Sequence, residues 1–244
     1  MAIWAITGGG GAPGVTTLAM SLARTLHENG RRAALVDLDP DGGVVALRAG
    51  VPSDPGIFLL LDPVRGVTPQ PGEILDMARQ TEEGWVAIPG FTHSGQAHQV
   101  SPVSGSELLR TMAQQFDEVV VDAGRSRPGL PGWMINTADH ALWVVDPSRE
   151  GVVRLAAALG GAMADRGLPG FVVINHSTRK DAVADVAIGI EQMWGVKVVS
   201  FCPEVAGDPG TSPAMTFACA QLISVMAPGM AIHTPPASKR RWRA

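Results

Sequence analysis

The chain reads Gly8-Gly9-Gly10-Gly11-Ala12-Pro13-Gly14-Val15-Thr16-Thr17 near its N-terminus, and this stretch decides its fold. It follows an apolar, strand-like segment, Ile3 to Ile6, and precedes a helix-like segment, Leu18 to His27. A glycine-rich turn between a strand and a helix commonly binds phosphate, because backbone N–H groups approach the anion and the helix N-terminus adds partial positive charge. We therefore expect an anion-binding loop here.

Two phosphate-binding motifs overlap in this loop. Gly9, Gly11 and Gly14 form the G-x-G-x-x-G pattern of dinucleotide-binding loops, and Asp37 follows at close to the expected distance. Alternatively, Gly14-Val15-Thr16-Thr17 stands where a P-loop has Gly-Lys-Thr-Thr, with the lysine missing. A third interpretation is a tight turn that binds nothing. The rest of the chain has to decide among the three.

Composition narrows the class of protein. The 244 residues are 45% hydrophobic and 17% charged, which is typical of a globular protein. A formal net charge of −4 gives no general indication of nucleic-acid binding. The only two cysteines, Cys202 and Cys219, are too few for a disulfide framework and favour a reducing, cytoplasmic location.

Strand-like and helix-like segments alternate along the chain. We expect strands at 3–6, 33–38, 85–88, 118–121, 141–145, 171–174 and 196–201. We expect helices at 16–29, 73–80, 106–116 with Ser106 as N-cap, 151–166, 181–194 and 212–226, an irregular connection at 52–72, and a polar loop at 93–103. Several strands are continuous apolar runs, as in strands covered on both faces.

This pattern predicts an α/β fold with a doubly wound, mostly parallel sheet flanked by helices. Residues 1–226 form one predicted domain, and 227–244 a disordered, proline-rich, basic tail. Ligands of such sheets bind where the strands end. The polar residues at the expected strand ends should therefore gather at one rim, and they are Asp37, Asp39, Asp122, Asp146 and Asn175.

The order and spacing of these motifs resemble the ParA/MinD-type P-loop ATPases. The resemblance rests on the glycine-rich loop with Thr16-Thr17, then Val36-Asp37-Leu38-Asp39-Pro40, Val119-Val120-Val121-Asp122 and Val172-Val173-Ile174-Asn175. Members of that family position plasmids, chromosomes, division sites, and pilus or secretion machinery. The resemblance implies a P-loop NTPase fold, ATP or ADP with Mg²⁺ as ligands, and a homodimer with a protein partner.

The resemblance also implies roles for single residues. The loop residues Gly9, Gly10, Gly11, Ala12, Pro13, Gly14, Val15, Thr16 and Thr17 would surround the phosphates. Thr16 matches the hydroxyl that helps hold Mg²⁺, and Thr17 matches a residue that meets the α-phosphate. Asp39 matches the carboxylate associated with the attacking water, with Asp37 beside it, and Asp122 matches an acidic residue that supports Mg²⁺ indirectly. Asn175 matches the amide that reads adenine, and Pro203 the loop that covers the base.

The loop departs from the family pattern at its cations. The family usually has Lys-Gly-Gly-x-Gly-Lys-Thr-Thr, whereas Gly10 and Val15 occupy the two lysine positions here and Ala12 replaces a glycine. Arg125 and Arg127 follow Asp122 and are candidates to supply the missing charge. We therefore expect weak or absent ATP hydrolysis and a role in assembly. The alternatives are an active ATPase switch and an NAD(P)-binding enzyme.

The densest basic run is Lys239-Arg240-Arg241-Trp242-Arg243. It is a candidate contact with an anionic membrane or with nucleic acid, so that the cytoplasmic protein would be peripheral to the membrane. The alternative is a tail that only adds solubility.

Overall fold

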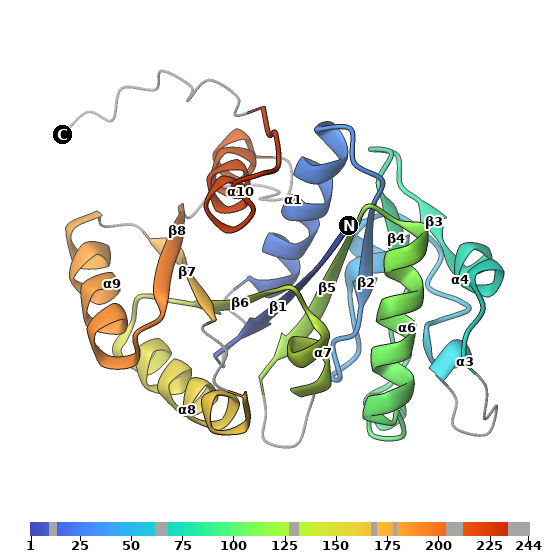
Figure 1. Cartoon of the computed structure of the whole chain (residues 1–244), viewed down its shortest axis with the longest axis horizontal. Coiled ribbons are helices and arrows are strands. Elements are labelled where there is room, and N and C mark those ends of the chain that lie inside the picture. Colours follow the sequence, from blue (N-terminus) through green and yellow to red (C-terminus); the bar gives the residue numbers. More distant parts are fainter. Residues whose placement is uncertain are drawn as a thin grey trace.

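The computed structural model describes residues 1–9, 14–61, 68–126, 132–166, 170–177, 180–203 and 212–233. Within these ranges the strands are β1 (Ala2–Gly8), β2 (Ala33–Asp37), β3 (Arg79–Gln80), β4 (Val86–Ile88), β5 (Glu118–Arg125), β6 (His140–Val145), β7 (Phe171–Ser177) and β8 (Lys197–Pro203). They form one sheet in the order β3-β4-β2-β5-β1-β6-β7-β8 (Figure 1). All of these pairings are parallel except β3 with β4. The predicted mostly parallel sheet is therefore confirmed.

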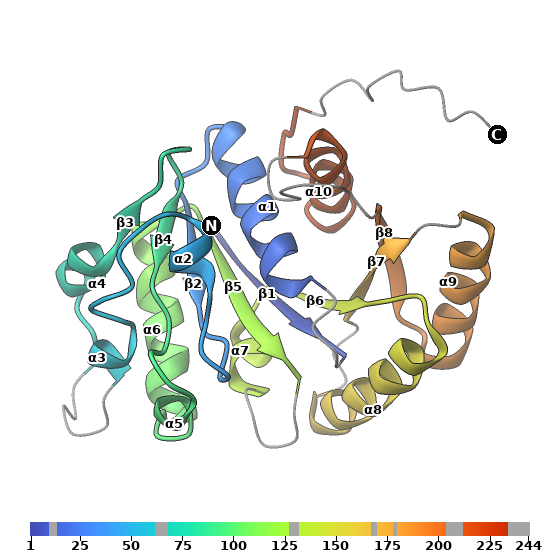
Figure 2. The same ribbon diagram turned by 180° about the vertical axis from the view of Figure 1, so that it is seen from behind.

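Helices cover both faces of the sheet, as the doubly wound prediction requires (Figures 1 and 2). One face carries α1 (Val15–Glu28), α2 (Val45–Arg48) and α10 (Pro213–Met226). The other carries α3 (Phe58–Leu61), α4 (Pro71–Met77), α5 (Ser94–Ala97), α6 (Pro102–Gln115), α7 (Gly132–Thr137), α8 (Arg149–Arg166) and α9 (Lys180–Trp194).

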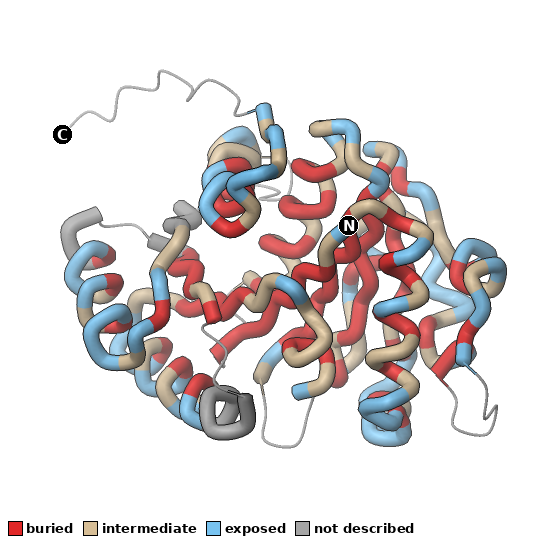
Figure 3. Tube along the Cα trace, in the orientation of Figure 1, coloured by how far each residue is buried: buried red, intermediate tan, exposed pale blue. Residues whose placement is uncertain are grey.

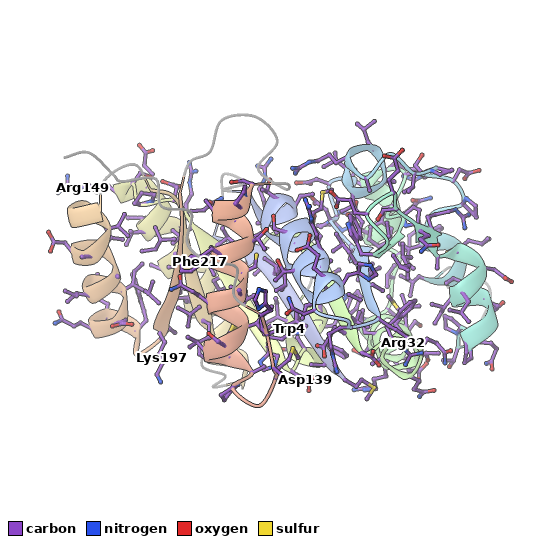
Figure 4. All side chains as sticks on the ribbon, turned by 90° about the horizontal axis from the view of Figure 1, so that it is seen from above. Trp4, Arg32, Asp139, Arg149, Lys197 and Phe217 are labelled. Atoms are coloured by element: carbon purple, nitrogen blue, oxygen red, sulfur yellow. The ribbon has the colours of Figure 1, made fainter. Side chains whose placement is uncertain are left out.

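Strand β1 contributes side chains to the hydrophobic cores on both faces of the sheet. Side chains alternate across a strand, so Ile3 and Ala5 pack against the α3–α9 layer, while Trp4 and Ile6 pack against the layer of α1 and α10. Trp4, labelled in Figure 4, is completely buried. The central strands are buried along most of their length (Figure 3), which explains their continuous apolar runs.

Several predicted boundaries were wrong. Helix α6 begins at Pro102, not at 106, because the Ser101 hydroxyl accepts a hydrogen bond from the Ser104 N–H (3.0 Å) and proline is favoured at the first helical position. The expected polar loop at 93–103 thus contains α5 and the start of α6. The helix expected at 73–80 ends at Met77, and the next residues form β3.

The end of the chain also differs from the prediction. Residues 227–233, assigned to a disordered tail, pack on the α1–α10 side through Met230 and Ile232. The His233 N–H donates to the Asn29 side chain (2.6 Å), which ties this segment to the end of α1. Residues 234–244, with the basic run, lie outside the described residues. Within the described ranges, no helix has both the length and the apolar character needed to cross a membrane.

Candidate functional site

The N-terminus of α1 lies at the edge of the sheet where the parallel strands end. Gly14 is its N-cap with φ +86°, a left-handed conformation that favours glycine. Among the described residues, no side chain caps this helix and its first turn is free of acidic residues. The uncapped N–H groups and the helix dipole favour an anion beside Thr16 and Thr17. The four preceding positions, 10–13, lie outside the described residues.

The ends of β1 and β5 are joined next to this helix. The Thr7 hydroxyl donates to the Gly124 carbonyl (3.1 Å), and the Ser126 N–H donates to the Gly8 carbonyl (2.9 Å). Gly9 packs so closely on α8 that an added Cβ would lie 2.9 Å from the Leu155 Cα. The Gly9 N–H also donates to the Val144 carbonyl (3.1 Å), so the first predicted loop residue is held between β6 and α8.

Asp37, the last residue of β2, pairs with Asp122, which lies within β5 three residues before the end of that strand. Their exposed fractions are 1% and 0%. Asp37 accepts backbone N–H hydrogen bonds on both oxygens, from Asp39 (3.2 Å) and Val45 (2.9 Å). Asp122 Oδ1 accepts from the Gly124 N–H (3.0 Å), whereas its buried Oδ2 has no hydrogen-bond partner among the described residues.

Burial has the largest effect on the pKa values of Asp37 and Asp122. Desolvation, reinforced by the charge of Asp122, raises the pKa of Asp37 to about 8, against the opposing effect of its two backbone hydrogen bonds. Desolvation likewise raises the pKa of Asp122 to about 6, while a hydrogen bond from the Thr16 side chain to this carboxylate lowers it. A bound cation would relieve the cost of keeping both carboxylates ionised.

The Asp39 side chain also lies beside β5, although β2 ends two residues earlier, at Asp37. Its carboxylate accepts from the Asp41 N–H (2.9 Å) and lies over Gly124, where an added Cβ would come within 2.4 Å of its Cγ. Asp39 is only partly buried. The structure therefore brings Asp37 and Asp39 next to the Asp122–Gly124 segment of β5.

Arg48 is a residue of this site that sequence reasoning missed. It lies at the end of α2, and its guanidinium donates to the Thr17 hydroxyl (3.1 Å). Its charge also acts on Asp122, whose pKa it lowers. No sequence signal marks it, because α2 is a four-residue helix that follows a turn.

The other predicted site residues lie at the same edge of the sheet or outside the described structure. Arg125 ends β5, pairs with Gly8 and is exposed. Asn175 is buried in β7, and Pro203 ends the neighbouring strand β8. Arg127 and the side chain of Pro203 are outside what the structure describes.

The residues present fit a hydrated Mg²⁺. This ion prefers oxygen ligands and usually keeps several waters alongside protein and phosphate oxygens. Asp122 Oδ2, which has no partner in the described part of the chain, and the hydroxyl of Thr16 provide such oxygens. In the described ranges, no group of three or more His, Cys, Asp or Glu side chains could hold a metal ion alone. Mg²⁺ would therefore be held together with a phosphate.

A parallel sheet with an uncapped helix N-terminus beside strand-end aspartates defines a phosphate-binding α/β protein. The family follows from the sequence as a whole. The chain belongs to the CobQ/CobB/MinD/ParA nucleotide-binding domain family, whose model matches residues 4–209.

Individual relatives agree with this assignment. An ATP-binding protein of Methanocaldococcus jannaschii is 26% identical over 225 residues, which cover 87% of this chain and 77% of that protein. MinD in the MinC:MinD cell division complex of Aquifex aeolicus superimposes with a TM-score of 0.73 at 16% identity, covering 96% and 98% of the two chains. MinD of Pyrococcus horikoshii, complexed with Mg-ADP, gives 0.70 at 19% identity over 93% and 96%.

Proposed function

We propose that this protein binds an adenine nucleotide with Mg²⁺ beside the N-terminus of α1. We further propose that it hydrolyses ATP slowly or not at all. It would act in the positioning or scaffolding of a partition, division, pilus or secretion apparatus. Family membership and the likeness to MinD and ParA structures support the nucleotide and the type of role. The Mg-ADP in the Pyrococcus horikoshii MinD structure supports the choice of ligands.

One observation carries the nucleotide proposal. The uncapped N-terminus of α1 lies beside a buried carboxylate oxygen, Asp122 Oδ2, that has no partner among the described residues. Such an oxygen is costly unless a ligand completes its surroundings. A phosphate on α1 with its Mg²⁺ near Thr16 would do so. Asn175 and Pro203 are then the proposed adenine contacts, at the same edge of the sheet.

The burial and hydrogen bonds of Asp37 and Asp39 support different roles for these two residues. Asp39, partly exposed, keeps the proposed role beside an attacking water. Asp37 has both oxygens engaged by backbone N–H groups, so it acts by shaping the loop. The burial of Asp37 disfavours the dinucleotide-enzyme alternative, because a ribose hydroxyl would have to reach a carboxylate that is only 1% exposed.

Slow hydrolysis is proposed because phosphoryl transfer depends on positioned positive charge. Val15 offers none at the position of the family lysine, and Gly10 none at the other. We expect turnover well below the usual range of roughly 1–10³ per second. Any residual activity should disappear in Asp39→Ala and fall in Arg125→Ala or Arg127→Ala. Fast turnover that survives both arginine changes would favour the active-switch alternative.

The nucleotide-bound protein is proposed to act by forming a homodimer and binding partners. We propose a homodimer that does not respond to hydrolysis, with the 93–103 and 125–132 segments as partner surface and residues 239–243 as a contact with anionic membrane or nucleic acid. Sedimentation with ADP, ATP and a non-hydrolysable analogue tests the dimer. A monomer that dimerises only with ATP and separates on hydrolysis would restore the active switch.

Calorimetry tests the central proposal directly. Purified protein is titrated with ATP, GTP and NADH, with and without Mg²⁺. We expect ATP to bind more tightly than GTP or NADH, with an affinity of roughly tens of micromolar or weaker, or about −6 kcal/mol. Tighter binding of NADH than of ATP would overturn the proposal.

A further inference from the structure

We propose that Arg48 supplies a phosphate-binding positive charge beside Thr17, on the α-phosphate side, while the loop still lacks the charge on which hydrolysis depends. The inference rests on the proposed nucleotide function and names a residue for it. Val15 cannot carry the charge itself, because its side chain is 4% exposed and packs in the core between α1, the sheet and α10. The cation would instead come from Arg48 at the end of α2, 31 residues after Thr17.

The contact with Thr17 places the guanidinium at the start of α1. Arg48 donates to the Thr17 hydroxyl at 3.1 Å, and this hydroxyl lies in the first turn of the uncapped helix. A phosphate at that helix N-terminus would lie beside the guanidinium. Arginine suits this position, because its planar group offers several donors and can contact a phosphate through two parallel hydrogen bonds.

The turn between Asp37 and Val45 holds α2 in the position that the hydrogen bond from Arg48 to Thr17 requires. Asp37 Oδ2 accepts from the N–H of Val45, the first residue of α2. Gly43 packs against the same carboxyl group, and an added Cβ would lie 1.8 Å from Oδ2. Val45 and Ala46 are buried, so α2 is anchored on the sheet while Arg48 stays exposed at its end. Arg48 is therefore positioned by the fold.

The charges around the site explain why a cation is needed. Asp37 and Asp39 lie next to the Asp122–Gly124 segment of β5, and an incoming phosphate would add further negative charge. The charge of Arg48 already reaches this group, since it lowers the pKa of Asp122. Arg125, at the end of β5, is exposed like Arg48, but of these two arginines only Arg48 donates to Thr17 within the described structure.

The test compares Arg48→Gln, Arg48→Lys and wild type by calorimetry with Mg-ATP, adenosine and inorganic tripolyphosphate. Arg110→Gln is the matched control, because Arg110 is an exposed arginine on α6, on the other face of the sheet. We expect Arg48→Gln to weaken Mg-ATP and tripolyphosphate binding about tenfold or more and to leave adenosine binding unchanged. Arg48→Lys should lose less, and Arg110→Gln should match wild type.

The outcomes separate this inference from the proposed function. If wild type binds Mg-ATP and Arg48→Gln binds it equally well, the inference is overturned and the nucleotide function stands. If wild type binds no nucleotide, both are overturned. An equal loss of adenosine and tripolyphosphate binding in Arg48→Gln also overturns the inference, since it would indicate a general disturbance of the site. Arg48→Lys keeps the charge, so a loss equal to that of Arg48→Gln would mean that charge is not what matters.

Discussion

Asp37 and Asp122 sit side by side on adjacent parallel strands, and both carboxyl groups are buried at the end of the sheet. Asp37 accepts one backbone N–H on each oxygen, and Asp122 keeps an oxygen with no partner among the described residues. Two neighbouring acids of this kind make the stability of the protein depend on pH and on whatever cation binds them.

Without nucleotide or Mg²⁺, the free energy of unfolding should fall as pH rises from about 5 to about 8. Both folded pKa values, about 8 for Asp37 and about 6 for Asp122, lie above the ordinary 3.8, so the folded state holds more protons in this range. The stability from the protonated groups is fully present below about pH 4 and is lost as pH rises through these values. Urea denaturation at several pH values measures the slope.

Asp122→Asn provides the comparison for that slope. The asparagine carries no charge to oppose Asp37, so the variant should lose less stability between pH 6 and pH 8 than wild type. A wild-type stability that stays level or rises over this range would contradict the prediction.

Gly43→Ala should destabilise the protein by about 1–3 kcal/mol, because the added methyl group collides with the Asp37 carboxyl group and forces the turn to move. Gly160→Ala is the matched control. Gly160 lies within α8 with nothing within 4 Å of the added Cβ, so alanine should stabilise by about 0.5–1 kcal/mol. Thermal unfolding of the two variants should therefore shift in opposite directions, and shifts of the same sign would count against the close contact at Gly43.

Glu118→Ala should destabilise by about 1–3 kcal/mol. The side chain of Glu118 is fully buried and accepts hydrogen bonds from Trp4 Nε1 and from Arg31, each at 2.8 Å. Its removal leaves the buried indole N–H of Trp4 unsatisfied. Asp117→Asn, which weakens the exposed pair with Arg32, should have a much smaller effect. Equal effects of the two variants in urea denaturation would refute the distinction.

Val15→Lys should lower stability in the absence of nucleotide by about 1.5–3 kcal/mol, because it removes a buried apolar side chain from the core beside α10. At the first position of α1 the longer side chain can still extend toward a phosphate, so Mg-ATP affinity should rise. Thermal unfolding with and without Mg-ATP measures both effects. A variant as stable as wild type that gains no affinity would contradict both parts.

The sheet and the acidic part of the site could be predicted because their signals are local. Apolar runs marked the buried strands, and aspartates directly after two of them had to meet at one edge once the strands were parallel. The start of α6 was missed because Ser101-Pro102 was assigned to a loop, although both residues are favourable for beginning a helix.

Arg48 could not be predicted for a different reason. Its role depends on a contact between residues 31 positions apart, made by a four-residue helix too short to show any periodicity. Its orientation comes from packing of the preceding turn on Asp37, which only the folded chain reveals. Arg125 and Arg127, which are closer in sequence to Asp122, were the candidates that sequence offered.

The two-residue strand β3 has a consequence for self-association. It runs antiparallel to β4 and ends the sheet on that side with a very short edge. A short edge offers few backbone groups for a further strand, which guards against ladder-like aggregation from this side. Orderly association through β3 is thereby disfavoured, which leaves the seven-residue strand β8, at the opposite side, as the longer edge of this sheet.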